Sequence, residues 1–409
     1  MQYKVNDNWV VVLVVGLVLP PILSMLFALY KFCATRNRVF GLIFSFFGVL
    51  FLTYNFFSID NCSRCMDAIA SYSVLPLDPL TSLMQLGINY LPLQCSHFIF
   101  IYILLIYIFL LFTLDKVHRS NWSIPAIFIF LSIISLRNSM DLLYYSLSIT
   151  FVLFFITNIK KISLIKCLIL IAITYLLHPG VLIILLPSIA LCYVISRYNN
   201  NLTYYLALMA IYVLFYILSH TTISAVGMPE IDSIIASFNS YTSNQYWGTR
   251  KGDTAIHGIT YTIIYYVIPF TYFILFIYTL KYRHIIKDKF VLAIFQVTIL
   301  FYPNFINFVT LTERALVVLS VTSVLCAISL IRTNKTIITM NFLVFYCALI
   351  FLFNITKWMG PISLHNVFKP NSYEEIRLYS YYVPSLYLLD YGTYGYSDEF
   401  LQKNTYITF

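Results

Sequence analysis

The stretch SIISLRNSMDLLYY, residues 132–145, places an arginine and an aspartate at the junction of two apolar segments. Ionisable side chains in such surroundings are costly in lipid and therefore mark candidate functional positions. The planar guanidinium of Arg137 suits the oxygens of a diphosphate, and Asp141 suits an orienting partner for it. The alternative is structural: Arg137 would anchor in lipid headgroups, and Asp141 would stabilise the first turn of the next helix.

A histidine occupies a second junction, in the stretch YLLHPGVLIILLP. Pro179 and Gly180 account for a break in the helix, but they do not account for the titratable imidazole of His178 at that break. The side chain either has a structural role, with its hydrogen bonds made at the membrane interface, or it accepts a proton or contacts a ligand near the membrane surface.

A third junction, in NFVTLTERALVVL, holds a glutamate and an arginine. Thr312 has the residue type of a helix N-cap, and Glu313 would then lie in the first turn, where a negative charge is favourable. Arg314 has no such explanation, because a cation near a helix N-terminus is unfavourable. We therefore expect Arg314 to contact an anionic ligand.

Aromatic and polar residues are mixed in the stretch YWGTRKGDTAIHG, which contains Tyr246, Trp247, Arg250, Asp253 and His257. Such a mixture suits sugar binding, since an aromatic ring stacks on the face of a pyranose. It is equally typical of a loop at the membrane interface. Both interpretations stay open from the sequence alone.

The composition indicates the elements that position these residues. The chain has 409 residues, of which 60% are hydrophobic and 10% charged, whereas an ordinary soluble domain carries about 25% charge. Apolar runs of membrane-helix length recur along the chain. We predict an all-α polytopic membrane protein with twelve spans, at residues 9–30, 39–59, 97–114, 124–136, 142–157, 162–177, 180–196, 202–219, 259–280, 290–309, 315–331 and 337–356.

The charges follow the predicted topology. Alternate loops contain 15 basic residues, against only two acidic ones, Asp115 and Asp288. Basic loops stay in the cytoplasm, so both termini are expected outside. This bias explains the net charge of +9 without nucleic acid as a partner. The predicted bundle covers residues 1–356, with external loops at 60–96 and 220–258, and a tail at 357–409 contains nine tyrosines that are expected to pack on the bundle.

Three cysteines fall in the predicted external loop 60–96, at Cys62, Cys65 and Cys95. Disulfides form outside the cytoplasm, and we expect a structural bridge between two of the three. Asp60 precedes this group. It either keeps the end of a helix in contact with water or takes part in acid–base chemistry. The sequence contains no phosphate-binding loop, dinucleotide motif or zinc motif, and no metal or cofactor is expected. Acidic residues do not cluster within the spans, which argues against an ion-coupled pump.

The order of these features resembles the EpsG/Wzy family of polysaccharide repeat-unit polymerases. The resemblance rests on an outward segment after the second span, SIDNCSRCMDAIASY, and on the stretches SLRNSMDLL, YLLHPGVLIILLP and LTERALVVLS. Arg137, His178 and Arg314 match positions typical of that family.

The resemblance implies a bacterial inner-membrane glycosyltransferase with a GT-C-like architecture and a periplasmic active site. Such enzymes transfer a growing glycan from undecaprenyl diphosphate to a sugar hydroxyl of the next lipid-linked repeat unit. Arginines would stabilise the charge of the leaving diphosphate. The general base would be His178, with Asp60 or Asp253 as alternatives. A chain-length regulator and a flippase are possible protein partners.

Two other functions stay open. An O-antigen ligase, or another lipid-linked glycosyltransferase, uses the same donor, so residue spacing does not separate it from a polymerase. A lipid-oligosaccharide flippase would also suit twelve spans. A flippase, however, needs a polar path from both sides, whereas the unusual polar residues here gather at the predicted outer face.

Overall fold

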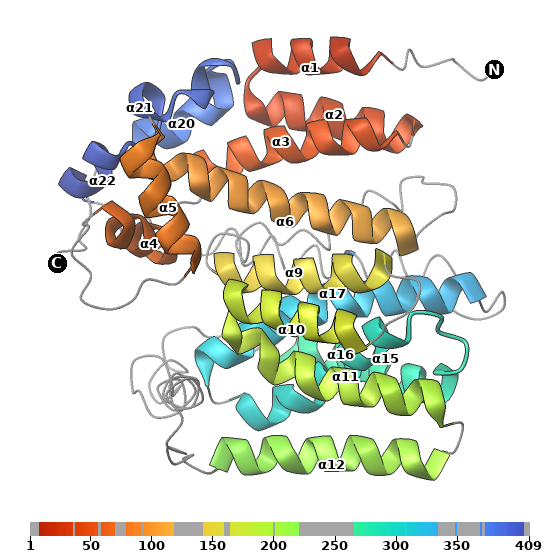
Figure 1. Cartoon of the computed structure of the whole chain (residues 1–409). Helices are drawn as coiled ribbons and strands as arrows, with labels where there is room; N and C mark the ends of the chain where they lie inside the picture. Colours follow the sequence, from red (N-terminus) through yellow and green to blue (C-terminus); the bar gives the residue numbers. More distant parts are fainter. Residues whose placement is uncertain are drawn as a thin grey trace, which may run out of the picture. The chain divides into compact units, whose positions relative to one another are not determined.

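The structure is a computed structural model of the whole chain (Figure 1). It describes residues 8–35, 37–55, 59–69, 79–91, 93–117, 142–158, 164–198, 201–220, 266–306, 308–333, 348–349, 369 and 373–404. All regular elements in these residues are helices, and no strand occurs among them. The predicted all-α class is therefore confirmed for the described part of the chain.

Five of the described helical stretches are long and apolar enough to cross a membrane. They are Arg38–Asn55, Cys95–Lys116, Pro179–Arg197, Asn201–His220 and Leu311–Leu330. Shorter apolar helices of 10–17 residues accompany them. A membrane protein is the class that these helices and the apolar composition indicate.

Helices occupy most of the predicted span positions. The predicted spans at 97–114, 142–157 and 202–219, for example, correspond to helices Cys95–Val117, Leu143–Asn158 and Asn201–His220. The agreement has a physical reason. Lipid offers the backbone N–H and C=O groups of an apolar run no hydrogen-bond partners, so the run forms a helix, in which these groups bind one another. The predicted spans at 124–136 and 337–356 lie outside the described residues, apart from residues 348–349.

The chain divides into two compact units. Unit 1 consists of Met1–Asp115, Arg119–Phe151 and Lys357–Phe409, and unit 2 of Lys116–His118 and Val152–Thr356. The helices of unit 1 are α1 (Trp9–Val18), α2 (Pro21–Thr35), α3 (Arg38–Asn55), α4 (Ile59–Ile69), α5 (Pro79–Tyr90), α6 (Cys95–Val117), α20 (Glu374–Tyr382), η3 (Tyr387–Leu389), α21 (Tyr391–Tyr394) and α22 (Asp398–Asn404). Helix α9 (Leu143–Asn158) begins in unit 1 and ends in unit 2.

The first predicted span, 9–30, is two helices rather than one. Helix α1 ends at Val18 and α2 begins at Pro21, because Pro20 and Pro21 lack the N–H groups that would continue the first helix. The break frees the Leu19 carbonyl, which accepts hydrogen bonds from the hydroxyl of Ser24 at 3.2 Å and from the backbone N–H of Ser385 at 3.0 Å. The C-terminal segment thus supplies a hydrogen-bond donor to the carbonyl that the break between α1 and α2 leaves without a helical partner.

The C-terminal segment also binds the end of α3. The Tyr54 hydroxyl donates to the Leu388 carbonyl at 2.7 Å, and the Tyr396 hydroxyl donates to the Tyr54 carbonyl at 3.0 Å. The rings of Tyr54 and Tyr391 stack with centroids 5.4 Å apart. All three tyrosines are fully buried. Part of the tyrosine-rich segment is therefore core, and α20 packs against both α2 and α3 (Figure 1).

The other end of α3 meets the end of α6. Arg38 forms an ion pair with Asp115 there. Along the same pair of helices, a Cβ added to Gly41 would lie 2.8 Å from Leu111 Cδ2, so the missing side chain allows the close approach of α6. Both members of this ion pair belong to loops that the sequence assigns to the cytoplasm.

Unit 2 contains α10 (Leu164–Leu177), η1 (Pro179–Val181), α11 (Leu182–Arg197), α12 (Asn201–His220), α15 (Ile268–Tyr282), α16 (Lys289–Phe305) and α17 (Val309–Thr333). Helix α16 is central, because it packs against α11, α12, α15 and α17. Its residues are almost all buried, including Gln296, whose amide donates to the Thr279 hydroxyl at 3.2 Å. Helix α12, in contrast, exposes apolar residues such as Leu206 and Met209, as expected for a helix that contacts lipid.

We predict that removing the Tyr54 hydroxyl loosens the C-terminal segment. The substitution Tyr54→Phe leaves the buried Leu388 carbonyl without its hydrogen bond and should cost about 1–3 kcal/mol. Limited proteolysis of the detergent-purified protein should then cut within residues 373–404 faster. Tyr387→Phe is the matched control, since Tyr387 is exposed. Equal cleavage rates in both variants would contradict the assigned role of the Tyr54 hydroxyl.

Candidate functional site

His178 lies in the connection between α10 and α11. Helix α10 ends at Leu177, because Pro179 cannot supply the N–H of the next turn. His178 itself has an extended backbone, with φ −167° and ψ 106°, and its Nδ1 atom accepts a hydrogen bond from the backbone N–H of Gly180 at 3.1 Å. The half-buried imidazole therefore caps η1, the short turn that leads into α11.

Arg314 lies on α17, deeper in the helix than the sequence suggested. Because α17 begins at Val309, Thr312 is not its N-cap. The Thr312 hydroxyl instead donates to the carbonyls of Phe305 and Phe308, both at 2.7 Å. The predicted cap is therefore wrong. By binding both carbonyls, the Thr312 hydroxyl links the end of α16 to the start of α17.

The structure brings His178 and Arg314 together over Gly180. A Cβ added to Gly180 would lie 2.8 Å from Cε1 of His178, 3.0 Å from Nδ1 of His178 and 3.5 Å from Nη1 of Arg314. The imidazole and the guanidinium thus share the space above one glycine, although 136 positions separate them in the chain. We call His178, Gly180 and Arg314 the glycine corner.

Glu313 is half-buried and precedes Arg314 on α17. Successive residues of a helix are rotated by about 100° around its axis. Glu313 and Arg314 therefore occupy different faces of α17, and Arg314 approaches Gly180.

The other predicted site residues are Asp60 and seven residues outside the described part of the chain. Asp60 is the second residue of α4, in unit 1. The remaining predicted residues lie outside the described part of the chain: Arg137, Asp141, Tyr246, Trp247, Arg250, Asp253 and His257. Among the described residues, no group of three His, Cys, Asp or Glu side chains is arranged to hold a metal ion.

A second polar cluster in unit 2 lies at the far end of α11. Arg283 is only 4% exposed, and its guanidinium lies 4.3 Å from the centre of the Tyr204 ring and donates to Asn201. The amino group of Lys289 donates to the Arg283 carbonyl at 2.7 Å. Because α11 has 16 residues, about 24 Å of helix lies between its two ends. Arg283 is one of the 15 basic residues that the sequence places in cytoplasmic loops, and its contact with the buried Tyr204 ring was not predicted.

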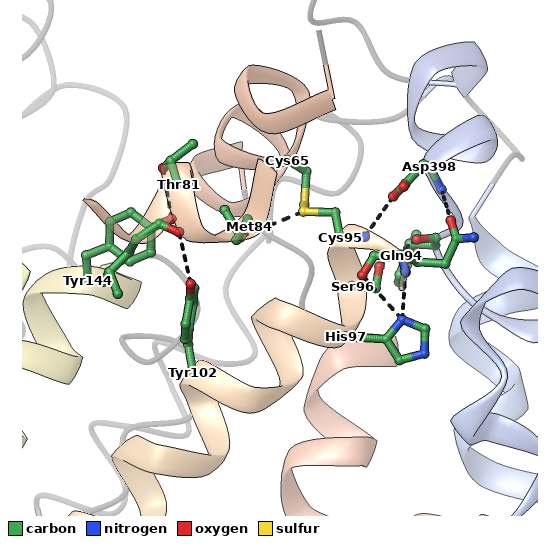
Figure 2. Close-up of a disulfide and its surroundings, with 12 residues drawn as sticks. Cys65, Thr81, Met84, Gln94, Cys95, Ser96, His97, Tyr102, Tyr144 and Asp398 are labelled. Atoms are coloured by element: carbon green, nitrogen blue, oxygen red, sulfur yellow. Dashed lines mark hydrogen bonds between the residues drawn. A yellow bond between two sulfur atoms is a disulfide. The ribbon is translucent and has the colours of Figure 1, made fainter. Parts of the chain in front are cut away.

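A disulfide joins α4 to the first residue of α6, as Figure 2 shows. It links Cys65 to Cys95, with their Cα atoms 5.6 Å apart, whereas Cys62 is buried and takes no part in the bridge. The predicted bridge between two of the three cysteines is confirmed, and the structure selects the pair.

The start of α6 also holds the C-terminal segment (Figure 2). The Asp398 carboxylate accepts from the backbone N–H of Cys95, and the backbone N–H of Asp398 donates to the Gln94 side chain, each at 2.8 Å. Partial burial raises the pKa of Asp398, and the Cys95 N–H opposes that shift. The sequence offers no local signal for this contact, because about 300 residues separate its two sides.

No protein-family model matches the chain, and neither a curated protein nor a solved structure matches it. The functional interpretation therefore depends on the residues and their geometry.

We expect loss of the disulfide to destabilise unit 1. The bridge closes a loop of 30 residues, and removing such a constraint costs about 3–4 kcal/mol on the chain-entropy account. Cys65→Ser should therefore lower the thermal midpoint of the purified protein. Cys33→Ser is the control, because Cys33 lies outside the bridge. An unchanged midpoint for Cys65→Ser would argue against the bridge as a stabilising element.

Proposed function

We propose that this chain is a bacterial inner-membrane polysaccharide polymerase of the kind that the EpsG/Wzy resemblance suggests. It would transfer a growing glycan from undecaprenyl diphosphate to a sugar hydroxyl of a lipid-linked repeat unit. The observation that carries the proposal is the glycine corner, where Arg314 and His178 meet at the end of apolar helices. Both residues were singled out from the sequence as candidates for contact with the substrate, and they come from distant parts of the chain.

The proposed chemistry needs a cation at the lipid diphosphate. The bond between the anomeric carbon of the donor sugar and the diphosphate oxygen breaks, and its electron pair passes to that oxygen. A bond forms between the anomeric carbon and the acceptor hydroxyl oxygen, whose proton passes to a general base. Arg314 would stabilise the growing negative charge of the leaving diphosphate. Arg137 would serve the same group, with the general base among His178, Asp60 and Asp253.

The proposed topology places the glycine corner on the periplasmic side of a twelve-span, GT-C-like bundle. Helix α6 of unit 1 suits a membrane span in the proposed topology, because its 23 residues measure about 35 Å, close to the thickness of a bilayer core. Its first residue carries a disulfide, and Asp115 near its other end pairs with Arg38. Disulfides form in the oxidising periplasm and basic residues concentrate on the cytoplasmic side.

The rest of the proposed site would bind sugar. Arg250, Tyr246, Trp247, Asp253 and His257 would contact the glycan from the external loop, with Asp141 and Glu313 as orienting carboxylates. A chain-length regulator and a flippase would be the protein partners, and surrounding lipid would hold the donor's polyprenyl chain.

We predict that Arg314→Ala abolishes chain growth while the protein stays in the membrane. Loss of a guanidinium that stabilises the leaving group should lower the rate by roughly 100- to 1,000-fold. Electrophoresis of cell-surface glycans should show a single repeat unit on its acceptor in place of a ladder. Arg197→Ala is the control, because Arg197 is an exposed arginine at the opposite end of α11.

A normal ladder in the Arg314→Ala variant would remove this residue from the mechanism. Deleting the gene separates a polymerase from a ligase with the same donor. Loss of a polymerase leaves one repeat unit attached, whereas loss of a ligase leaves none.

A further inference from the structure

The connection between α15 and α16 carries a buried guanidinium whose contacts in the described chain are uncharged. Arg283 is 4% exposed. Its guanidinium donates to the side-chain oxygen of Asn201 and lies 4.3 Å from the centre of the Tyr204 ring, with the centre of the Tyr205 ring 6.0 Å away. Buried arginines are usually paired with an anion, and among the described residues no carboxylate pairs with Arg283.

A second cation lies beside this guanidinium. Lys289, the first residue of α16, is half-buried. Its amino group donates to the backbone carbonyls of Arg283 at 2.7 Å and of His284 at 3.3 Å, which are both neutral acceptors. The Arg283 guanidinium acts on this amino group as a like charge. The connection therefore holds two positive charges close together.

The carboxylate that is nearest in the sequence is not the partner of either cation. Asp288 precedes Lys289, but in the described part of the chain it forms no ion pair with Lys289 or Arg283. It interacts electrostatically with Cys326 of α17. The pKa of the exposed His284 is lowered, first by loss of solvation and then by the charges of Arg283 and Lys289. The connection is therefore positive as a whole.

The chemistry of these groups and their surroundings indicate a phosphate carried by a lipid. A guanidinium presents several N–H groups in one plane and suits phosphate oxygens, and the ammonium beside it adds a point charge. The sequence assigns this connection to the cytoplasmic side, where anionic headgroups attract Lys and Arg. The helices that carry Tyr204 and precede Arg283 also expose apolar residues, such as Leu206 of α12 and Ile277 of α15, which offer surfaces for acyl chains.

We infer that Arg283 and Lys289 bind the phosphate of an anionic membrane lipid, while Asn201 holds the guanidinium in place. The phosphate would lie between the two cations and offset their repulsion. Cys192, in the last part of α11, interacts electrostatically with Lys289, whereas His178 precedes α11. The lipid site is therefore separate from the glycine corner, and it does not depend on the polymerase proposal.

Two neutral variants and one matched control test the site. Arg283→Gln and Lys289→Gln each remove one of the two cations. Lys281→Gln removes an exposed lysine in the last turn of α15, with the same change in net charge. We would measure equilibrium binding of phosphatidylglycerol to the full-length protein in neutral detergent, with phosphatidylcholine and inorganic phosphate as comparison probes. Size-exclusion chromatography of each variant checks that it folds.

We expect the wild-type protein to bind phosphatidylglycerol more tightly than phosphatidylcholine or inorganic phosphate. Arg283→Gln and Lys289→Gln should each bind it roughly tenfold more weakly, as expected for a lost hydrogen bond to a charged acceptor, and Lys281→Gln should bind it like the wild type. Wild-type affinity in either site variant, or equal weakening in Lys281→Gln, would overturn the inference. Binding of inorganic phosphate as tight as that of phosphatidylglycerol would overturn the assignment to a lipid.

The wild-type protein offers a test that needs no variant of the site to fold. The pKa of His284 is lowered by loss of solvation and by Arg283 and Lys289, so an anion bound between the two cations should raise it. Nuclear magnetic resonance of nitrogen-labelled histidine should show this rise after one equivalent of phosphatidylglycerol is added, on the resonance that disappears in His284→Asn. A pKa of His284 that does not change would contradict the lipid site. Neither measurement uses chain growth, so failure of the polymerase proposal leaves the result unaffected.

Discussion

Backbone hydrogen bonding in apolar surroundings governs this structure. A helix satisfies its own N–H and C=O groups, so any break in an apolar helix leaves groups that need another partner. Two breaks caused by proline illustrate the constraint. At Leu19 the partners are Ser24 and Ser385, and at Gly180 the partner is the imidazole of His178. At both breaks a polar side chain supplies a hydrogen-bond partner that the interrupted helix lacks.

The same constraint relates structure to the proposed chemistry. A side chain that repairs a helix break is held in one orientation, since moving it would leave a buried backbone group unsatisfied. The ring of His178 is positioned in this way, and the absence of a side chain at Gly180 lets Arg314 approach it. The position of His178 in the glycine corner thus follows from helix termination.

Much of the helical organisation could be predicted from the sequence, because length and hydropathy alone determine where apolar helices form. Hydropathy is insensitive to a local break, so the run 9–30 was predicted as one span, although Pro20 and Pro21 divide it into α1 and α2. Thr312 was misinterpreted for a related reason: capping chemistry identifies a residue type, whereas the actual start of α17 at Val309 depends on how α16 ends.

The candidate site could be predicted only in part. Arg314 and His178 were identified singly from charges that topology left unexplained, but nothing local predicts that they meet. The contacts of Tyr54 with Leu388, and of Cys95 with Asp398, join positions more than 300 residues apart. Such pairings arise from the tertiary fold and leave no periodic or spacing signal, which is why the sequence also left the choice among Cys62, Cys65 and Cys95 open.

The position of the C-terminal segment has a consequence for biogenesis. Unit 1 combines residues that precede most of unit 2 in the chain with residues that follow it. The helices of unit 2 lie between Leu19 and Ser385 in the chain, so the ribosome synthesises them before the hydrogen bond between these two residues can form. During insertion, unit 1 is therefore completed only after the helices of unit 2 have been made.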